Sequence, residues 1–162
     1  MTPDELVELE RIKQLKYRYA RCLDQKDWDG VEGCFTEDAT ASYGGAKPLE
    51  GREAILGFLR ASLESTSRIT THFVGQPEIE LTGPGTAEGT WALHDQVIDT
   101  EHGFNVRGAS FYSDRYEKVR GEWLLAHTGY RRLYEELEKR SDEVRMTAHW
   151  WDTDGKSELI PD

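Results

Sequence analysis

The sequence predicts an α+β domain in which the helices precede the strands. Three segments with apolar residues at helical spacing lie within residues 4–64, and four long segments with strand character follow between residues 69 and 134. Helices and sequentially adjacent strands that are segregated in this way are typical of the class. Strands this long must twist and curve, so we expect helices across the concave side of a mostly antiparallel sheet. Such a cone with an open mouth suits a small-molecule pocket.

Each helix has its own signal in the sequence. Residues 4–23 place apolar side chains on one face, which predicts an amphipathic first helix. Asp27 is a suitable N-cap for a short second helix. A brief strand is expected over Thr40–Tyr43, before a double-glycine turn, and residues 51–64 form the third helix.

The remaining core consists of strands separated by turn residues. We expect these strands at roughly residues 69–82, 86–99, 104–119 and 122–134. The domain is assigned to residues 1–145, and residues 146–162 form a C-terminal tail. The tail contains Trp150-Trp151, and two adjacent Trp side chains are costly to expose. We therefore expect the tail to cover a pocket mouth or an oligomer contact.

Composition and charge argue against several classes of function. A chain of 162 residues suits one domain with a substantial core. Its net charge of −11 disfavours nucleic acid and anionic membrane surfaces as partners. Two cysteines and an acidic start predict a cytoplasmic protein. The sequence contains neither a glycine-rich phosphate loop nor a metal-ligand spacing, so we expect no cofactor and no metal ion.

One acid lies in an otherwise apolar strand face. Trp91, Leu93, Asp95 and Val97 alternate with residues of the opposite face, and this apolar set is the inward one. The Asp95 carboxylate therefore points into the interior, where a charge needs a partner or shifts its pKa. We interpret it as the wall of a polar-lined pocket. A structural Asp paired with an Arg or a backbone amide is the alternative.

Four further polar residues are candidates for the same pocket. Tyr19 lies on the apolar face of the first helix, where its hydroxyl needs a partner. Asp24 closes that helix, although the helix dipole disfavours a carboxylate there. His72 lies inside a strand, and Arg132 follows Tyr130 on one face of the last strand, where it could meet a carboxylate or an anionic substrate group. Each of these residues, taken alone, also has a purely structural explanation.

Several segments together resemble a known family. The segments are Leu15–Asp24, His72–Ile79, Trp91–Asp95, Gly108–Glu117 and Thr128–Glu136. In these segments the chain resembles the SnoaL-like branch of the nuclear transport factor 2-like superfamily, over roughly residues 5–140. Within that branch it is most similar to the bile acid 7α-dehydratases, with more distant similarity to scytalone dehydratase and hexachlorocyclohexane dehydrochlorinase.

This resemblance implies a cone-shaped α+β barrel with N-terminal helices on a strongly curved, mixed and mostly antiparallel sheet. The bile acid dehydratases carry an active-site Tyr and Asp on the first helix, a strand His, a strand Asp and a late Arg. These positions correspond to Tyr19, Asp24, His72, Asp95 and Arg132. The dehydrochlorinase pairs its first-helix Asp with the strand His, which implies that Asp24 and His72 are neighbours. The pocket walls and the tail depart from the family pattern, which bears on the substrate more than on the chemistry.

These residue types suit a cofactor-independent dehydratase acting on a hydrophobic, steroid-like or polycyclic oxo-hydroxy substrate. An imidazole serves as general base near neutral pH, and Asp24 or Asp95 orients it. Tyr19 could donate to the carbonyl oxygen as it becomes an oxyanion. Two alternatives remain open: an isomerase or polyketide cyclase, which needs no leaving-group acid, and a non-catalytic small-molecule-binding domain.

The predicted sheet also suggests self-association. We expect a homotrimer or homodimer, with no nucleic-acid or membrane partner. The outer face of the last two strands is predicted to carry Tyr112, Tyr116 and Trp123. One layer of helices cannot cover so much apolar surface, so this face would form the contact.

Overall fold

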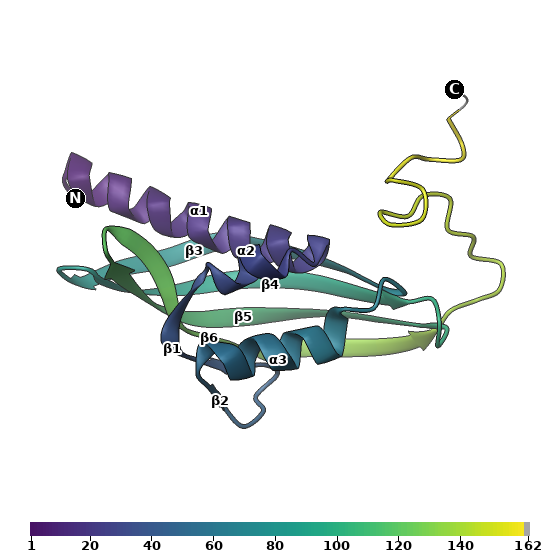
Figure 1. Ribbon diagram of the computed structural model, residues 1–162, viewed down its shortest axis with the longest axis horizontal. Coiled ribbons are helices and arrows are strands. Elements are labelled where there is room, and N and C mark those ends of the chain that lie inside the picture. The colour runs from purple at the N-terminus through teal and green to yellow at the C-terminus, as the bar shows by residue number, and fades with distance from the viewer. Residues whose placement is uncertain (161–162) are drawn as a thin grey trace.

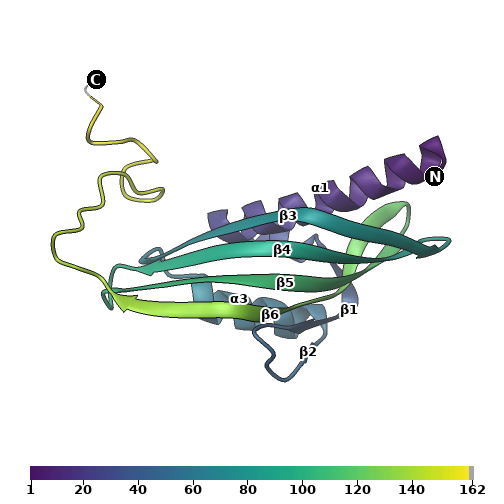
Figure 2. The same ribbon diagram turned by 180° about the vertical axis from the view of Figure 1, so that it is seen from behind.

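The computed structural model describes residues 1–160 and has an α+β fold built from one layer of helices and one sheet. Helices α1 and α3 lie on the same side of the sheet (Figure 1). Seen from behind, the long strands lie in front of the helices, and no helix of residues 1–160 covers that face (Figure 2). The elements are α1 (Pro3–Gln25), α2 (Trp28–Glu32), β1 (Phe35–Ser42), β2 (Leu49–Glu50), α3 (Arg52–Leu63), β3 (Arg68–Gly83), β4 (Thr86–Asp99), β5 (Phe104–Val119) and β6 (Glu122–Lys139).

The sheet has the strand order β2-β1-β6-β5-β4-β3. Strand β1 pairs with β6 in parallel, and all other pairs are antiparallel. Consecutive hairpins therefore connect β3 to β6, and β3 forms one edge of the sheet. This arrangement confirms the predicted mixed, mostly antiparallel sheet with helices on one side.

Helix α1 is capped at both ends. The Thr2 hydroxyl accepts a hydrogen bond from the Glu5 amide and the Glu5 carboxylate accepts one from the Thr2 amide, which satisfies donors of the first turn. At the other end, Lys26 adopts a left-handed conformation with φ of 56°. Its ammonium group donates to the carbonyl oxygens of Leu63 and Arg68. These bonds tie the end of α1 to α3 and to the start of β3.

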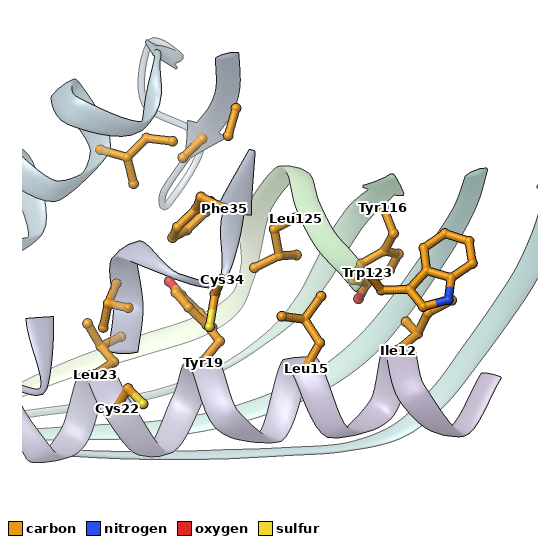
Figure 3. Packing of buried hydrophobic residues seen from close by; sticks show 14 of the residues in the cluster. Ile12, Leu15, Tyr19, Cys22, Leu23, Cys34, Phe35, Tyr116, Trp123 and Leu125 are labelled. Atoms are coloured by element: carbon orange, nitrogen blue, oxygen red, sulfur yellow. The ribbon is translucent and has the colours of Figure 1, made fainter. Parts of the chain in front are cut away.

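The main core lies between α1 and the sheet, as Figure 3 shows. Ile12, Leu15 and Tyr19 of α1 are at most 2% exposed and pack with Phe35 of β1 and Leu125 of β6. The ring of Tyr19 meets Phe35 edge to face, with the centroids 5.6 Å apart. The apolar face predicted for the first helix is therefore the face that packs on the sheet.

The strand ends differ from the sequence prediction. Strand β1 begins at Phe35 rather than at Thr40, β6 continues to Lys139 rather than ending near residue 134, and the two-residue β2 was not predicted. The start of β1 pairs in parallel with Leu125, a partner that local sequence does not reveal. The end of β6 is rich in Glu, which does not favour a strand, but β6 remains paired with β5 as far as Lys139.

The prediction that Tyr112, Tyr116 and Trp123 lie on the outer face is wrong. All three are at most 4% exposed and lie on the helix-covered side. Tyr112 is directly opposite the inward Trp91 across the β4–β5 ladder, so the two side chains share a face. Alternation alone could not assign the face, because large aromatic residues occupy both sides of β5.

Residues 140–160 contain neither helix nor strand and lead away from the end of β6 (Figure 1). Trp150 is 56% exposed. The Lys26 ammonium lies 4.9 Å from the centroid of the Trp151 ring, so the tail contacts the end of α1. The covering role expected for the tail stays a prediction. Among residues 1–160, no helix is both long and apolar enough to span a membrane.

Candidate active site

Asp24 and His72 form a hydrogen-bonded pair between the last turn of α1 and the edge strand β3. Nδ1 of His72 lies 2.6 Å from Oδ1 of Asp24. The Asp24 carboxylate also accepts hydrogen bonds from the backbone amide of His72 and from the hydroxyl of Thr70, both at 2.8 Å. Asp24 therefore holds both the backbone and the ring of His72. The expectation that Asp24 and His72 are neighbours is confirmed.

The Asp24 contact also sets the proton on the imidazole ring. A carboxylate can only accept a hydrogen bond, so in the neutral ring Nδ1 carries the proton and Nε2 carries the lone pair. None of the hydrogen bonds among residues 1–160 uses Nε2. The side chains of His72 and Asp24 are 12% and 23% exposed, so the pair is largely shielded from solvent but accessible.

Asp95 is paired with Arg132 rather than with His72. The Arg132 guanidinium donates to both carboxylate oxygens of Asp95, and the Nη2–Oδ2 distance is 3.0 Å. Arg132 also donates to Ser110 at 3.2 Å and to Glu135 at 2.9 Å. Burial alone would lower the pKa of Arg132, but the hydrogen bond and charge of Asp95 outweigh it and raise that pKa. Arg132 therefore remains a cation.

A glycine makes room for this ion pair. Gly108 of β5 is directly opposite Asp95 of β4. A Cβ atom at Gly108 would lie 2.7 Å from Nη1 of Arg132 and 2.8 Å from the carbonyl oxygen of Tyr134. The guanidinium therefore reaches from β6 across β5 to Asp95 because Gly108 has no side chain.

The two pairs lie side by side on the inner face of the sheet. His72 is directly opposite Asp95 in the β3–β4 ladder, and residues in such positions have Cβ atoms about 5 Å apart. The strand alternation that predicted an inward Asp95 is confirmed, since its side chain is 7% exposed and faces inward with Trp91 and Leu93. The alternative explanation, an Asp paired with an Arg, is confirmed, whereas a place for Asp95 in a pocket wall stays a prediction.

Tyr19 does not hydrogen-bond with any of the other four predicted residues. It is 1% exposed, and its hydroxyl lies 3.1 Å from that of Tyr43. Tyr43 is 6.0 Å from Tyr130 between ring centroids, and the Arg132 guanidinium lies 4.8 Å from the centroid of the Tyr130 ring. Burial raises the pKa of Tyr19 and of Tyr43, so both hydroxyls keep their protons. Tyr43 and Tyr130 thus connect Tyr19 to the Arg132 pair.

The sequence did not identify several neighbours of the site. Thr70 precedes His72 by two residues and so shares its strand face, which was a usable signal. Tyr130 likewise precedes Arg132 by two residues and so shares its strand face. Tyr43 lies just after β1 and pairs with Tyr19 only through the folding of the chain. A surface groove of about 420 Å³ reaches the site between α1 and β3, where Asp24, His72, Tyr17 and Phe73 are among its lining residues.

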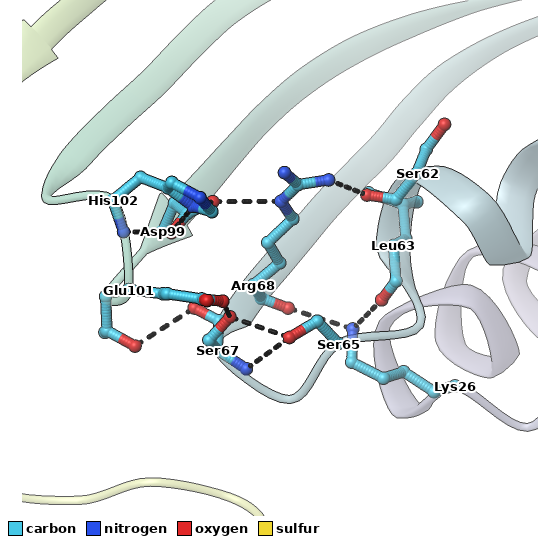
Figure 4. A network of polar contacts seen from close by, with 10 residues as sticks. Lys26, Ser62, Leu63, Ser65, Ser67, Arg68, Asp99, Glu101 and His102 are labelled. Atoms are coloured by element: carbon cyan, nitrogen blue, oxygen red, sulfur yellow. Dashed lines mark hydrogen bonds and ion pairs between the residues drawn. The ribbon is translucent and has the colours of Figure 1, made fainter.

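A polar network borders the site where β3 begins (Figure 4). Arg68 donates to Asp99 at 2.9 Å and to the carbonyl oxygen of Ser62 at 2.7 Å. His102 donates its backbone amide to Asp99 at 2.7 Å. Burial would raise the pKa of Asp99, but the hydrogen bonds from His102 and Arg68 outweigh it and lower the pKa to about 2. This network fixes the strand that carries His72.

Within residues 1–160, no group of three or more His, Cys, Asp or Glu side chains is placed to hold a metal ion. The polar groups of the site are instead satisfied by each other. Asp24 accepts three hydrogen bonds, and Asp95 is held by both arms of Arg132. The arrangement offers one free nitrogen base beside a neutralised ion pair.

Residues 4–129 match the model of the SnoaL-like domain, so the chain belongs to the SnoaL-like family. Among solved structures, a scytalone dehydratase-like protein from Novosphingobium aromaticivorans superposes with a TM-score of 0.77 and 21% identity, over 90% of this chain and 99% of that one. The hexachlorocyclohexane dehydrochlorinase LinA-type3 from Novosphingobium barchaimii gives a TM-score of 0.75 and 16% identity, over 88% and 96%. A protein of unknown function from Mycobacterium tuberculosis gives 0.69 and 28% identity, over 82% and 76%. These likenesses place the chain in the nuclear transport factor 2-like fold.

Proposed function

We propose that this chain is a cofactor-independent hydro-lyase that removes water from a hydrophobic oxo-hydroxy substrate, with His72 as the general base. One observation carries this proposal: Asp24 binds Nδ1 of His72 at 2.6 Å and leaves the Nε2 lone pair free. An imidazole held in this way can accept a proton, and the carboxylate stabilises the imidazolium that forms. The fold likeness to a scytalone dehydratase-like protein and to a dehydrochlorinase gives further support.

The reaction begins at the carbon next to the substrate carbonyl. Nε2 of His72 takes the proton from that carbon, and the C–H electron pair moves into an enolate. The enolate then re-forms the carbonyl and expels the hydroxyl group from the β-carbon. The imidazolium returns its proton to the departing oxygen, which leaves as water. Asp95 is bound to Arg132 as a carboxylate, so the imidazolium is the better proton donor of the two.

Two further pairs are assigned supporting roles. The Tyr43 hydroxyl donates to the carbonyl oxygen as negative charge develops on it. Tyr19 donates to Tyr43 and so acts through it, because its own hydroxyl is buried at 3.1 Å from Tyr43. Arg132 supplies positive charge near the enolate, and Asp95 fixes the position of its guanidinium.

The side chains around the two pairs support a proposal for the substrate class. Inward positions beyond Asp95 carry Val97 and Val106, which are partly buried, and α3 presents Phe58, which is 43% exposed and stacks on Tyr43. Apolar and aromatic side chains beside a polar site favour a ligand that is largely hydrophobic. We therefore propose a steroid-like or polycyclic oxo-hydroxy compound.

The test is turnover of a panel of 3-oxo steroids and small hydroxyketones, followed by mass spectrometry. The proposal expects a product that has lost the mass of water, made by the parent but not by His72→Ala. His94→Ala is the matched control, because His94 lies on the neighbouring strand but is exposed on the opposite face. A product of unchanged mass would identify an isomerase, and binding without turnover would identify a binding domain. Either result contradicts the proposal.

A further inference from the structure

The groove between helix α1 and the edge strand β3 contains a cation that the reaction proposed above does not use. In both views of the fold α1 lies beside β3 (Figures 1 and 2). Arg21 lines this groove of about 420 Å³ together with both members of the Asp24–His72 pair. A ligand that fills the groove therefore contacts the proposed base and the Arg21 side chain at the same time.

The other walls of the groove are mostly apolar. Tyr17 of α1 is 46% exposed, and its ring meets the buried Trp91 edge to face with the centroids 5.9 Å apart, which holds it in place. Phe73 and Val74 of β3 line the opposite side, and Ala20 lies between the two walls. Aromatic and aliphatic walls of this kind suit the ring system of a hydrophobic ligand.

The Arg21 guanidinium is not paired with an acid of the protein. Its Nη1 donates to Oε1 of Gln25 at 2.8 Å, and Gln25 is a neutral residue. None of the ion pairs within residues 1–160 uses Arg21. A guanidinium has five N–H donors, so the single hydrogen bond to Gln25 leaves several of them for a ligand.

Asp24 is the one acid that lines the groove, and it is committed to other partners. Its carboxylate accepts hydrogen bonds from Thr70 and from the backbone and ring of His72. Arg21 precedes Asp24 by three residues, which is about 4.5 Å along the helix axis. A ring system of steroid size is long enough to reach from His72 to the Arg21 guanidinium.

We propose that Arg21 binds a carboxylate carried by the substrate, and so makes the His72 site selective for acids over their neutral counterparts. A guanidinium matches a carboxylate with two parallel N–H···O bonds. The net charge of −11 repels an anion elsewhere on the protein, so the preference depends on this local cation. Arg21 lies away from the reacting atoms and determines specificity. The inference rests on the proposed function only in calling the ligand a substrate.

Isothermal titration calorimetry with two matched ligands tests the proposal without turnover. The ligands are a 3-oxo steroid carboxylic acid and its methyl ester, which share one ring system and have no hydroxyl group to lose. The parent should bind the acid about tenfold more tightly than the ester, as expected for one charge-assisted contact. Added NaCl should reduce this preference, because salt screens the exposed charge of Arg21 but does not affect the neutral ester.

Three variants locate the preference on the Arg21 side chain. Arg21→Gln should bind acid and ester equally, with the ester affinity of the parent, whereas Arg21→Lys should keep part of the preference because it keeps the charge. Arg18→Gln is the matched control: Arg18 is also exposed on α1 and its loss changes the net charge equally, but it does not line the groove. It should keep the full preference. Far-UV circular dichroism and melting temperature establish that the variants are folded.

The binding results are separable from the test of the reaction. Equal binding of acid and ester to the parent, no binding of either ligand, or a preference that survives in Arg21→Gln would overturn the proposal, even if the steroid panel loses water. If the preference depends on Arg21 but no panel member loses water, the proposed reaction fails and the carboxylate site stands. With a hydroxylated form of the acid as substrate, Arg21→Gln should raise KM about tenfold and leave kcat unchanged, because the contact is the same in the ground state and the transition state.

Discussion

Two pairs on the helix-covered side of the sheet each join a carboxylate to a nitrogen group, but they differ in how completely the protein satisfies their polar atoms. The Lys16–Asp114 pair, at 2.7 Å, is 0% exposed on both sides. Asp114 also accepts hydrogen bonds from Tyr116 and Thr128, and the Lys16 ammonium lies 3.4 Å from the centroid of the Tyr112 ring. By contrast, the Asp24–His72 pair is partly exposed and leaves Nε2 without a hydrogen bond among residues 1–160.

The comparison shows what separates a scaffold charge from a candidate reactive group. The fully buried acid, Asp114, belongs to the scaffold, so burial of a carboxylate does not by itself identify a site. In the Lys16–Asp114 pair, which we call the sealed pair, every polar group is bound by another group of the protein, so none remains for a substrate. In the Asp24–His72 pair, which we call the open pair, the acid accepts three hydrogen bonds, whereas Nε2 of the base has none among residues 1–160. We infer that the unsatisfied, accessible atom beside a saturated acid identifies the reactive group.

The largest effect is expected for Asp24→Asn in the open pair. The amide group of Asn would donate toward Nδ1 and favour the tautomer with the proton on Nε2. The base would then lack its lone pair, and kcat should fall by about 10²–10⁴-fold. The free energy of unfolding should change little, because the helix dipole disfavours a carboxylate at the C-terminal end of α1 and this unfavourable interaction is removed together with the hydrogen bonds. Steady-state kinetics and a melting curve on the same sample check both statements, and unchanged turnover would exclude Asp24 from the reaction.

Lys16→Met in the sealed pair should give the opposite result. It leaves Asp114 buried without its cation, which should cost about 3–5 kcal/mol of unfolding free energy. Turnover per folded molecule should stay close to that of the parent. Urea denaturation measures the loss, and adding Asp114→Asn should recover most of it. If the single variant is as stable as the parent, the sealed pair is not part of the scaffold.

Acid should destabilise the protein through Asp99, with an effect smaller than those expected for Asp24→Asn and Lys16→Met. Its side chain is 0% exposed and its pKa is lowered from 3.8 to about 2. Since the folded-state pKa is depressed, the stabilisation is complete above about pH 4 and is lost as the pH falls through 2. The shift corresponds to about 2 kcal/mol. Urea denaturation between pH 5 and 2 should show this slope in the parent and a flatter one in Asp99→Asn; equal slopes would contradict the assignment.

The smallest effect is expected for Asp95→Asn. This change keeps the shape but loses the charge that holds Arg132, which retains Ser110 and Glu135 as partners. Turnover should fall by about tenfold, equivalent to about 1.4 kcal/mol of transition-state stabilisation. Steady-state kinetics beside Asp24→Asn give the ranking. A larger loss for Asp95→Asn would make Asp95, and not Asp24, the principal acid.

The sequence predicted the parts of the site that depend on local periodicity. Strand alternation correctly predicted that Asp95 faces inward, and Asp27 correctly predicted the start of α2 as its N-cap. The family resemblance correctly implied that Asp24 and His72 are neighbours. These features are local or are repeated in related chains, so a single sequence carries them.

The features that failed depend on long-range pairing. The choice between Asp24 and Asp95 as the partner of His72 required knowing that α1 crosses β3 and that Gly108 lets Arg132 reach Asp95. The wrong face for Tyr112 arose because β5 has large aromatic residues on both sides, and only the register with Trp91 decides between them. Lys16 was not singled out, although it lies on the same face of α1 as Ile12 and Tyr19.

The most direct test of the account is the protonation state of the His72 ring nitrogens, observed by ¹⁵N NMR of the parent near neutral pH. The measurement needs no substrate and depends on no assumed reaction. The Asp24 contact predicts that the neutral ring carries its proton on Nδ1 and leaves Nε2 bare, and that Asp24→Asn loses this preference. A neutral His72 with its proton on Nε2 in the parent would contradict the proposal that Asp24 prepares His72 to act as a base.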